Sequence, residues 1–283
     1  MRRLFWILTL GLGLVSVAAQ AQSESTAKLW ARWKAHDSQS TATIDNGAYD
    51  AFLKKYVVVH QDGPNGVRYS DVSSADRHKL EHYIQTLEKV DIDHYNRHVQ
   101  RAYWLNLYNA ETIDLVLQHY PIKSVRDIGS LLHHGPWQKK VLKVEGQKLT
   151  LNDISRRILR PIWTDGLTLY GLSCGAISCA SLRQTAYTGS NVYSALYENA
   201  EDYVNSPEGV RFDHDGGLKI SKIYKWYKDD FGGDKRGVIN HIRRYAAPQL
   251  SVHLEADRHI AGYDFDWALN SEANVSAKAA HDH

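Results

Sequence analysis

The longest helical pattern in the chain runs from Arg101 to Pro121. Apolar residues recur there over about five turns, and a proline cannot continue the helix, so Pro121 marks its end. Apolar positions fall all around this helix, which predicts burial on most sides. Shorter helices are predicted around Trp30, from Tyr49, from Asp76, over Leu151–Arg160 with Asn152 or Asp153 as its cap, from Val192 to Tyr203, over Lys222–Phe231 and over Val238–Ala247.

Alternating apolar and polar residues predict only short strands. Val141–Thr150 alternates around Glu145-Gly146, and a second hairpin is predicted on either side of His214–Gly217. Val67–Tyr69 is predicted as a strand, and Leu167–Leu172 as a strand that leads to Cys174. No internal repeat and no long linker divides the chain. We therefore predict an α+β fold: one mostly helical domain with short β-hairpins and a small sheet.

The first residues read as a secretory signal peptide. Two arginines precede an apolar run, and Ala19-Gln20-Ala21 fits a cleavage site. The run is shorter than the ~20 residues that a spanning helix needs. We predict a signal peptide over residues 1–21, a domain over residues 22–270 and a disordered tail over residues 271–283. From this division we expect a periplasmic or secreted location. We expect no transmembrane segment after the signal peptide.

Charge gives no reason to expect a polyanionic partner. Lysine and arginine number 34 and aspartate and glutamate 32, for a formal net charge of +2. No nucleic-acid partner is therefore expected. Adjacent histidines such as His133-His134 point in different directions on any regular element, so they do not predict a metal site. Neither a metal nor a cofactor is expected. The sequence does not identify a partner, and a small molecule or a peptide is a candidate ligand.

Both cysteines lie in one run of small residues, LYGLSCGAISCASLR. In an oxidising compartment, Cys174 and Cys179 would by default form a disulfide. On one regular helix their Cα atoms would be about 7.5 Å apart along the axis, too far for a bridge. Either the segment bends between them, or at least one thiol is free.

Two further groups of polar and aromatic residues are candidates for function. Asn106 and Asn109 lie three apart on one face of the long helix, where they could hydrogen-bond to backbone or orient a catalytic group. The many tyrosines and tryptophans could form a carbohydrate- or peptide-binding surface, although aromatic residues at helical spacing are more often core. Trp226 and Tyr227, next to Lys225 and Lys228, are the best surface candidates.

Several strings in order resemble the domain of unknown function 547 family. They are AYWLNLYNAETIDLVLQHYPIKSVRDI, LTLNDISRRILRPIW, YGLSCGAISCASLR, LKISKIYKWYKDDFGG and YDFDWALN. The resemblance runs from about Trp30 to Asn270. It implies a secreted or periplasmic bacterial protein with no established activity, and related domains in plants and animals are joined to other modules, some of them thiol-redox domains.

The chain departs from the family pattern at three places. The pattern has Glu-His where this chain has Ser155-Arg156, and Arg-x-His where it has residues 167–169, which end in Leu169. A proline often stands in place of Ala180. If those histidines carry protons in the family, this chain lacks both.

Three classes of function stay open, so the sequence does not decide whether the protein is an enzyme. The preferred one is a non-catalytic binding or scaffold domain, with Trp226, Tyr227, Arg156 and Arg183 as candidate ligand contacts. The second is a cysteine-dependent hydrolase or acyl transferase. It would use Cys174 at a helix N-terminus, Asn106 and Asn109 for orientation, and His119, His134 or His214 as a base. The third is thiol-disulfide exchange by Cys174 and Cys179, with Arg156 or Arg183 lowering the thiol pKa.

Overall fold

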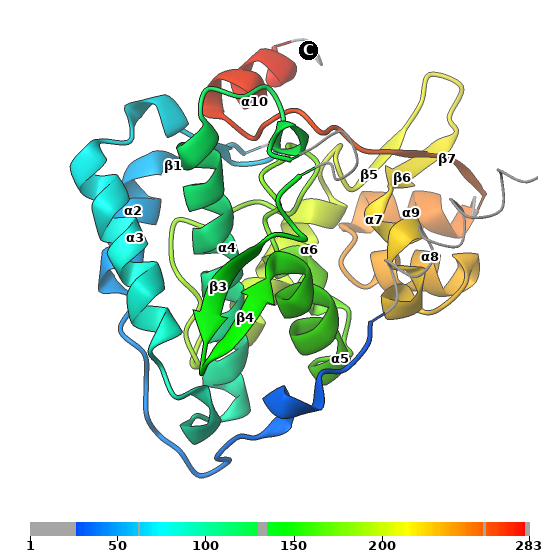
Figure 1. The fold of residues 1–283 in the computed structure, drawn as a ribbon. Coiled ribbons are helices and arrows are strands. Elements are labelled where there is room, and N and C mark those ends of the chain that lie inside the picture. The colour runs from blue at the N-terminus through cyan, green and yellow to red at the C-terminus, as the bar shows by residue number, and fades with distance from the viewer. Residues whose placement is uncertain (1–26, 62, 130–134, 257–258, 281–283) are drawn as a thin grey trace, which may run out of the picture.

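The structure is a computed structural model that describes residues 27–61, 63–129, 135–256 and 259–280. Helices dominate these residues, and the strands form two hairpin-like pairs and one three-stranded sheet (Figure 1). The predicted α+β class, mostly helical with short hairpins and a small sheet, is confirmed. The predicted signal peptide and the pair His133-His134 lie outside the described residues.

The larger part of the molecule is built around α4 (Arg97–His119). Nearly every side chain from Val99 to Val116 is buried, as the pattern predicted. The elements that enclose α4 are α2 (Gly47–Tyr56), α3 (Ser74–Glu88), α5 (Arg160–Ile162), α6 (Val192–Val204), the π-helical turn η5 (Asp153–Leu159), the pair β1 (Val57–Val58) and β2 (Gly66–Val67), and the hairpin β3 (Lys140–Val144) and β4 (Gln147–Thr150). Together they form the main hydrophobic cluster.

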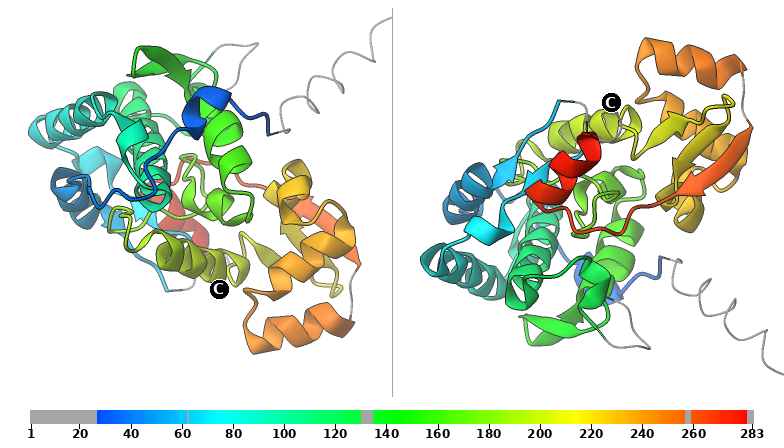
Figure 2. Two further views of the ribbon diagram at one scale, coloured as in Figure 1. Left: turned by 90° about the horizontal axis from the view of Figure 1, so that it is seen from below. Right: turned by 90° about the horizontal axis from the view of Figure 1, so that it is seen from above.

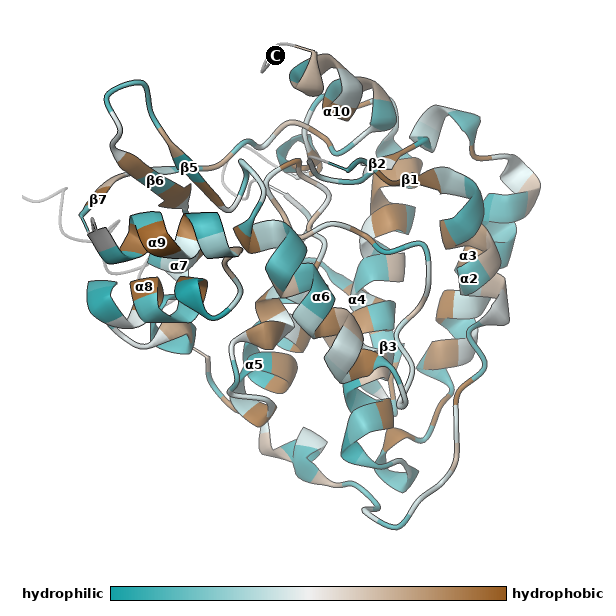
Figure 3. Cartoon of the chain, turned by 180° about the vertical axis from the view of Figure 1, so that it is seen from behind, coloured by the Kyte–Doolittle hydropathy of each residue, from teal (hydrophilic) through white to brown (hydrophobic). Residues whose placement is uncertain are grey.

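A second hydrophobic cluster lies to one side of the first (Figures 1 and 2). Its sheet pairs β5 (Val210–Phe212) with β6 (Leu218–Ser221) as the predicted hairpin, and β7 (Ile260–Asp264) adds parallel to β6. The helices that cover it are α7 (Ile223–Trp226), α8 (Lys235–Arg243) and α9 (Pro248–Ala256), with the 3₁₀ turn η7 (Lys228–Phe231). In Figure 3 both hydrophobic and hydrophilic residues occur along α8 and α9, and the buried ones of α8 are Val238, Ile239, His241 and Ile242.

Single 3₁₀ turns complete the framework. They are η1 (Ala31–Lys34), η2 (Tyr69–Asp71), η3 (Ile92–His94), η4 (Val125–Asp127) and η6 (Leu167–Gly171). The last is a correction, because Leu167–Leu172 was predicted to be a strand. Thr168, Leu169, Tyr170 and Gly171 are consecutive buried residues, so both sides of the segment face protein and no strand lies beside it to pair with. A single helical turn satisfies this burial without a partner strand.

Two other expectations at the ends of elements were wrong. The predicted caps Asn152 and Asp153 do not act as N-caps. Instead, the Thr150 hydroxyl accepts the Asp153 amide and the Asp153 carboxylate accepts the Thr150 amide. The predicted disordered tail contains helix α10 (Glu272–Ala279), which Ser271 caps through the Asn274 amide and which packs against β2. Its one buried apolar residue, Val275, gave too weak a pattern for the sequence to predict it.

Candidate functional site: the disulfide-closed loop

Cys174 and Cys179 are joined by a disulfide, with their Cα atoms 5.7 Å apart. The bend that permits the bridge is at Gly175, which has a φ of +84°, a conformation that favours glycine. Cys179 is buried and Cys174 is half-buried. We call residues 172–187 the cysteine loop. No helix begins within it, since the next one is α6 at Val192, and the prediction of Cys174 at a helix N-terminus was therefore wrong.

Asn109 holds the start of the cysteine loop. Its side-chain amide donates to the Gly171 carbonyl at 2.9 Å, and its side-chain oxygen accepts the Ser173 amide at 2.9 Å. Asn109 is 4% exposed, so these two bonds replace water for both of its polar atoms. The backbone one residue before Cys174 is thereby fixed to α4.

Asn106 holds the end of the same loop in the same way. Its amide donates to the Tyr187 carbonyl at 2.8 Å, and its oxygen accepts the Tyr187 amide at 3.0 Å. Asn46 donates to the same carbonyl at 3.2 Å. Of the two roles open from the sequence, backbone hydrogen bonding is the one observed. Both polar atoms of each α4 amide therefore bond to backbone groups.

The C-terminal segment secures the middle of the loop. The Ile177 amide donates to the Ala268 carbonyl, and the Asn270 amide donates to the Gly175 carbonyl. The Ser178 hydroxyl bonds to the buried carboxylate of Glu208 and accepts the Asp266 amide at 2.7 Å. Lys278, on α10, pairs with both Glu208 and Asp266. The loop is thus held by residues far from it in sequence.

A cavity of about 360 Å³ opens beside Cys179. Arg183 lies in its wall and binds the Ala195 carbonyl, Asn199 and Glu198. The Arg183 Nε is buried without a partner. The other polar residues that line the cavity are Asn65, Ser181, Gln184, Thr185, Glu198, Asn199, Asp202, Ser206 and Glu208. A volume of this size suits a small ligand.

A second surface is aromatic, and it contains the predicted residue Trp226. Trp137, Trp226, Phe265 and Trp267, which we call the aromatic surface, are all half-buried. The ring centroids lie 5.8 Å apart for Trp137 and Trp267, 5.7 Å for Trp226 and Trp267, 4.9 Å for Trp226 and Phe265, and 4.5 Å for Phe265 and Trp267. The predicted ligand contacts are therefore divided, since Arg183 lies in the cavity and Trp226 on the aromatic surface.

Arg156 lies close to Tyr108, which Trp137 of this surface also contacts. Burial raises the pKa of Tyr108, and Tyr227 adds to the rise, whereas Trp137 and the positive charge of Arg156 oppose it. Arg156 has no ion-pair partner among the described residues, and its Nε is buried without a hydrogen bond. Tyr227 stacks with a different arginine, Arg160, whose guanidinium lies 4.5 Å from the ring centroid and pairs with Asp230.

The two described histidines that were candidates for a base lie in exposed positions. His119 ends α4 and its Nδ1 contacts the Leu115 carbonyl at 2.8 Å, while His214 lies in the β5–β6 turn. His241, which sequence reasoning did not single out, is buried and lies 3.1 Å from the Tyr170 hydroxyl. Burial, followed by the positive charge of Arg244, lowers the pKa of His241 to about 4.

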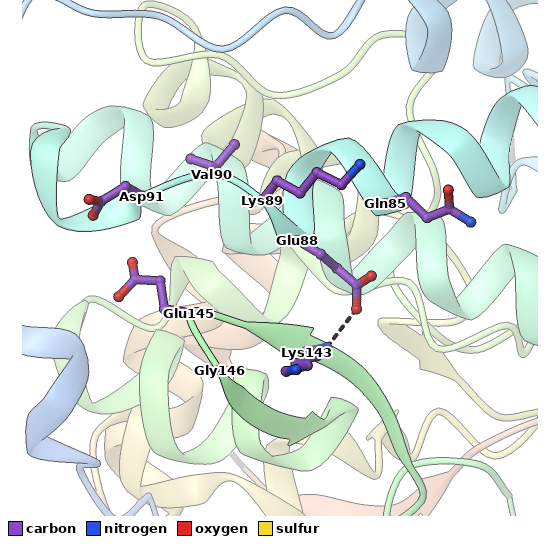
Figure 4. Close-up of a pocket in the computed structure, with 8 residues that line it drawn as sticks. All are labelled: Gln85, Glu88, Lys89, Val90, Asp91, Lys143, Glu145 and Gly146. Atoms are coloured by element: carbon purple, nitrogen blue, oxygen red, sulfur yellow. Dashed lines mark hydrogen bonds between the residues drawn. The ribbon is translucent and has the colours of Figure 1, made fainter.

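A groove of about 640 Å³ lies between the end of α3 and the β3–β4 hairpin (Figure 4). At one end the carboxylates of Asp91, Asp93 and Glu145 come together. Arg32 forms ion pairs with both Asp93 and Glu145, and Glu145 also accepts the Ile92 amide. A metal ion would have to displace this guanidinium, so the arrangement is that of a satisfied ion-pair cluster.

The sequence does not single out Glu208, Asp266 and Lys278, because no local pattern connects them. Their roles arise only when the segments around residues 178, 208, 266 and 278 meet in space. The one available signal was the polar residue Asp266 within the aromatic string YDFDWALN.

Similarity to known proteins is restricted to the part of the chain that carries the loop. Residues 92–204 match the family described as "Protein of unknown function, DUF547". The match extends from η3 to the end of α6, so it includes both asparagines and both cysteines. No curated protein and no solved structure matches the chain. The DUF547 resemblance outside residues 92–204, and the departures at Arg156, Leu169 and Ala180, stay predictions.

Proposed function

We propose that the protein is a secreted or periplasmic binding domain of the DUF547 type, in which the disulfide is structural and the cavity beside Cys179 receives a small molecule or peptide. In this proposal residues 1–21 are a signal peptide and residues 22–270 the domain. Among the described residues, no helix combines the length and apolar character needed to cross a bilayer. A disulfide is the expected state of two close thiols in an oxidising compartment.

The observation that carries the proposal is the bridge itself. A cysteine nucleophile acts as a thiolate, and neither Cys174 nor Cys179 is free. The asparagines that could have oriented a base are bonded to loop backbone. Serines and carboxylates line the cavity, but the hydrogen bonds of Ser181 and Ser206 are with the Asn65 amide and the Tyr203 carbonyl and not with a base.

Thiol titration of the folded mature protein tests the proposal. We expect no reaction with a thiol reagent in the unreduced protein and two reactive thiols after reduction and unfolding. A single fast-reacting thiol in the unreduced protein would instead support the cysteine-dependent hydrolase or acyl transferase.

One observation favours thiol-disulfide exchange as a second candidate. Cys179 lines the cavity, so a partner thiol of suitable shape has a route towards the bridge. The cysteine loop is also held by hydrogen bonds that do not depend on the disulfide. Rapid reduction in the folded state at a mild redox potential, followed by reoxidation, would favour this candidate over a structural bridge.

A further inference from the structure

The aromatic surface lies where the two hydrophobic clusters meet. Trp137 and Trp267 pack against the main cluster, Trp226 packs against the second, and Phe265 packs against both. In Figures 1 and 2 the chain from β7 to α10, which carries residues 265 and 267, passes from the one part of the molecule to the other. Junctions of this kind are common positions for ligand sites.

Charge around the aromatic surface is not balanced. The Arg126 guanidinium lies 5.4 Å from the centroid of the Trp267 ring and has no ion-pair partner among the described residues. Arg156 lies near Tyr108, which Trp137 also contacts; it too has no ion-pair partner among the described residues, and its Nε is buried and unbonded. A donor without a partner destabilises the protein, and a bound acceptor would offset that cost.

The nearby carboxylates do not neutralise these two arginines. Asp230 pairs with Arg160, Asp264 with Arg211, and Asp266 with Lys278. Asp127, next to Arg126 in the sequence, accepts the Ser124 amide in a capping box. None of these carboxylates forms an ion pair with Arg126 or Arg156. The aromatic surface has two cationic donors beside it, and an anionic ligand is the complementary one.

The ring geometry limits the shape of that ligand. Neighbouring rings are tilted by 34° to 58° and their centroids are 4.5–5.8 Å apart. Each pair already touches, so a planar base or aromatic ring cannot insert between two of them. A ligand must lie on the outer faces, where aromatic rings offer apolar contact to C–H groups and the arginines offer hydrogen bonds.

We propose that the aromatic surface, with Arg126 and Arg156, binds an acidic saccharide, a short chain of pyranose rings that carry carboxylates. The pyranose C–H groups pack on the outer aromatic faces that Arg126 does not cover, those of Trp226 among them, and the carboxylates accept hydrogen bonds from Arg126 and Arg156. This surface is separate from the cavity beside Cys179, and the inference holds whether or not that cavity takes a ligand.

Tryptophan fluorescence tests the inference, because the rings that would contact the saccharide are also the reporters. The mature protein is titrated with trigalacturonic acid and, in parallel, with the neutral trisaccharide maltotriose. We expect saturable quenching by the acidic compound and none by the neutral one. Salt should weaken the binding, since part of the affinity comes from charge.

Two arginine variants and one control decide whether the surface is the site. Arg126→Ala and Arg156→Gln should each weaken binding about tenfold or more, the loss expected for one charge-assisted hydrogen bond. Arg236→Gln, an exposed arginine of α8, should change it less than twofold. Arg126 is itself exposed, so its variant keeps the test valid even if Arg156→Gln unfolds. Absence of quenching, equal quenching by both sugars, or unchanged affinity in Arg126→Ala would overturn the inference.

Discussion

At the scale of single residues, the two asparagines of α4 are the most informative side chains. Each pairs its whole amide with the main chain of the cysteine loop, one at the start and one at the end. Their spacing of three residues, visible in the sequence, is what lets one helix face hold both ends. The sequence left two roles open for them, because which backbone groups would arrive opposite that face depends on the fold.

Replacing Asn109 with alanine should destabilise the protein by about 3 kcal/mol. The change leaves the Gly171 carbonyl and the Ser173 amide unpaired in a buried position, at about 1–3 kcal/mol for each group. Urea denaturation measures the difference. The control Asn240→Ala, at an exposed position of α8, should stay within about 0.5 kcal/mol of wild type. Equal stability of the two variants would show that the hydrogen bonds of Asn109 do not hold the cysteine loop.

His241 should make the protein less stable in mild acid. Its pKa is about 4 in the folded state, against 6.5 in the unfolded chain, because burial disfavours the charged ring. Between these values the unfolded state binds the proton and the folded state does not. The contribution of neutral His241 to the free energy of unfolding is therefore fully present above pH 6.5. It falls by about 3 kcal/mol at most as the pH drops to 4.

Unfolding free energies measured across that pH range check this sign. His241→Gln should have a shallower loss of stability than wild type from pH 6.5 to 4. His214→Gln, in the exposed β5–β6 turn, serves as the matched control and should follow wild type. If the unfolding free energy of His241→Gln fell with pH as steeply as that of wild type, His241 would not be the cause of the acid sensitivity.

At the scale of elements, patterns predicted the helices well and the cysteine loop poorly. The long helix α4, the helix α6 and the β3–β4 and β5–β6 hairpins follow from periodicity and turn residues. The turn η6, the strand β7 and the helix α10 do not, because each is stabilised by distant partners. β7 pairs in parallel with β6 across a separation of about forty residues, and such pairing leaves no local signature.

The loop should remain in place without its disulfide. Closing so short a loop stabilises the fold by only about 2 kcal/mol on chain-entropy grounds. The double variant Cys174→Ser, Cys179→Ser should therefore lose about that much in urea denaturation and unfold in one transition. Wild type measured in a reducing buffer is the control and should behave like the double variant. Failure of the double variant to fold would mean that the hydrogen bonds from Asn106, Asn109 and the C-terminal segment are not sufficient.

At the scale of the whole molecule, the C-terminal segment joins both hydrophobic clusters to the loop. It runs from β7 to α10 (Figure 1). Lys278 of α10 pairs with the buried carboxylate of Glu208. This arrangement explains why a segment expected to be a disordered tail is ordered. Its stability comes from ion pairs and backbone hydrogen bonds with other parts of the chain.

Removing the charge of Lys278 should destabilise the whole protein. Lys278→Met leaves Glu208 buried with only Ser178 as a partner, and breaking a buried ion pair in this way costs about 3 kcal/mol. Thermal and urea unfolding measure the loss. Lys235→Met, at an exposed position of α8, is the matched control. Adding Glu208→Gln to Lys278→Met should recover part of the stability, and no recovery would show that charge is not the cause.

The central claim is that the two cysteines of the native protein are joined in a disulfide and that neither is a free thiol. Intact-mass spectrometry of the purified mature protein, without reduction and after alkylation of accessible thiols, tests it most directly. The account predicts one species, unalkylated and lighter than the reduced chain by two hydrogen atoms. A species carrying an alkyl group at Cys174 or Cys179 would contradict it, because it would reveal a free thiol in the folded protein.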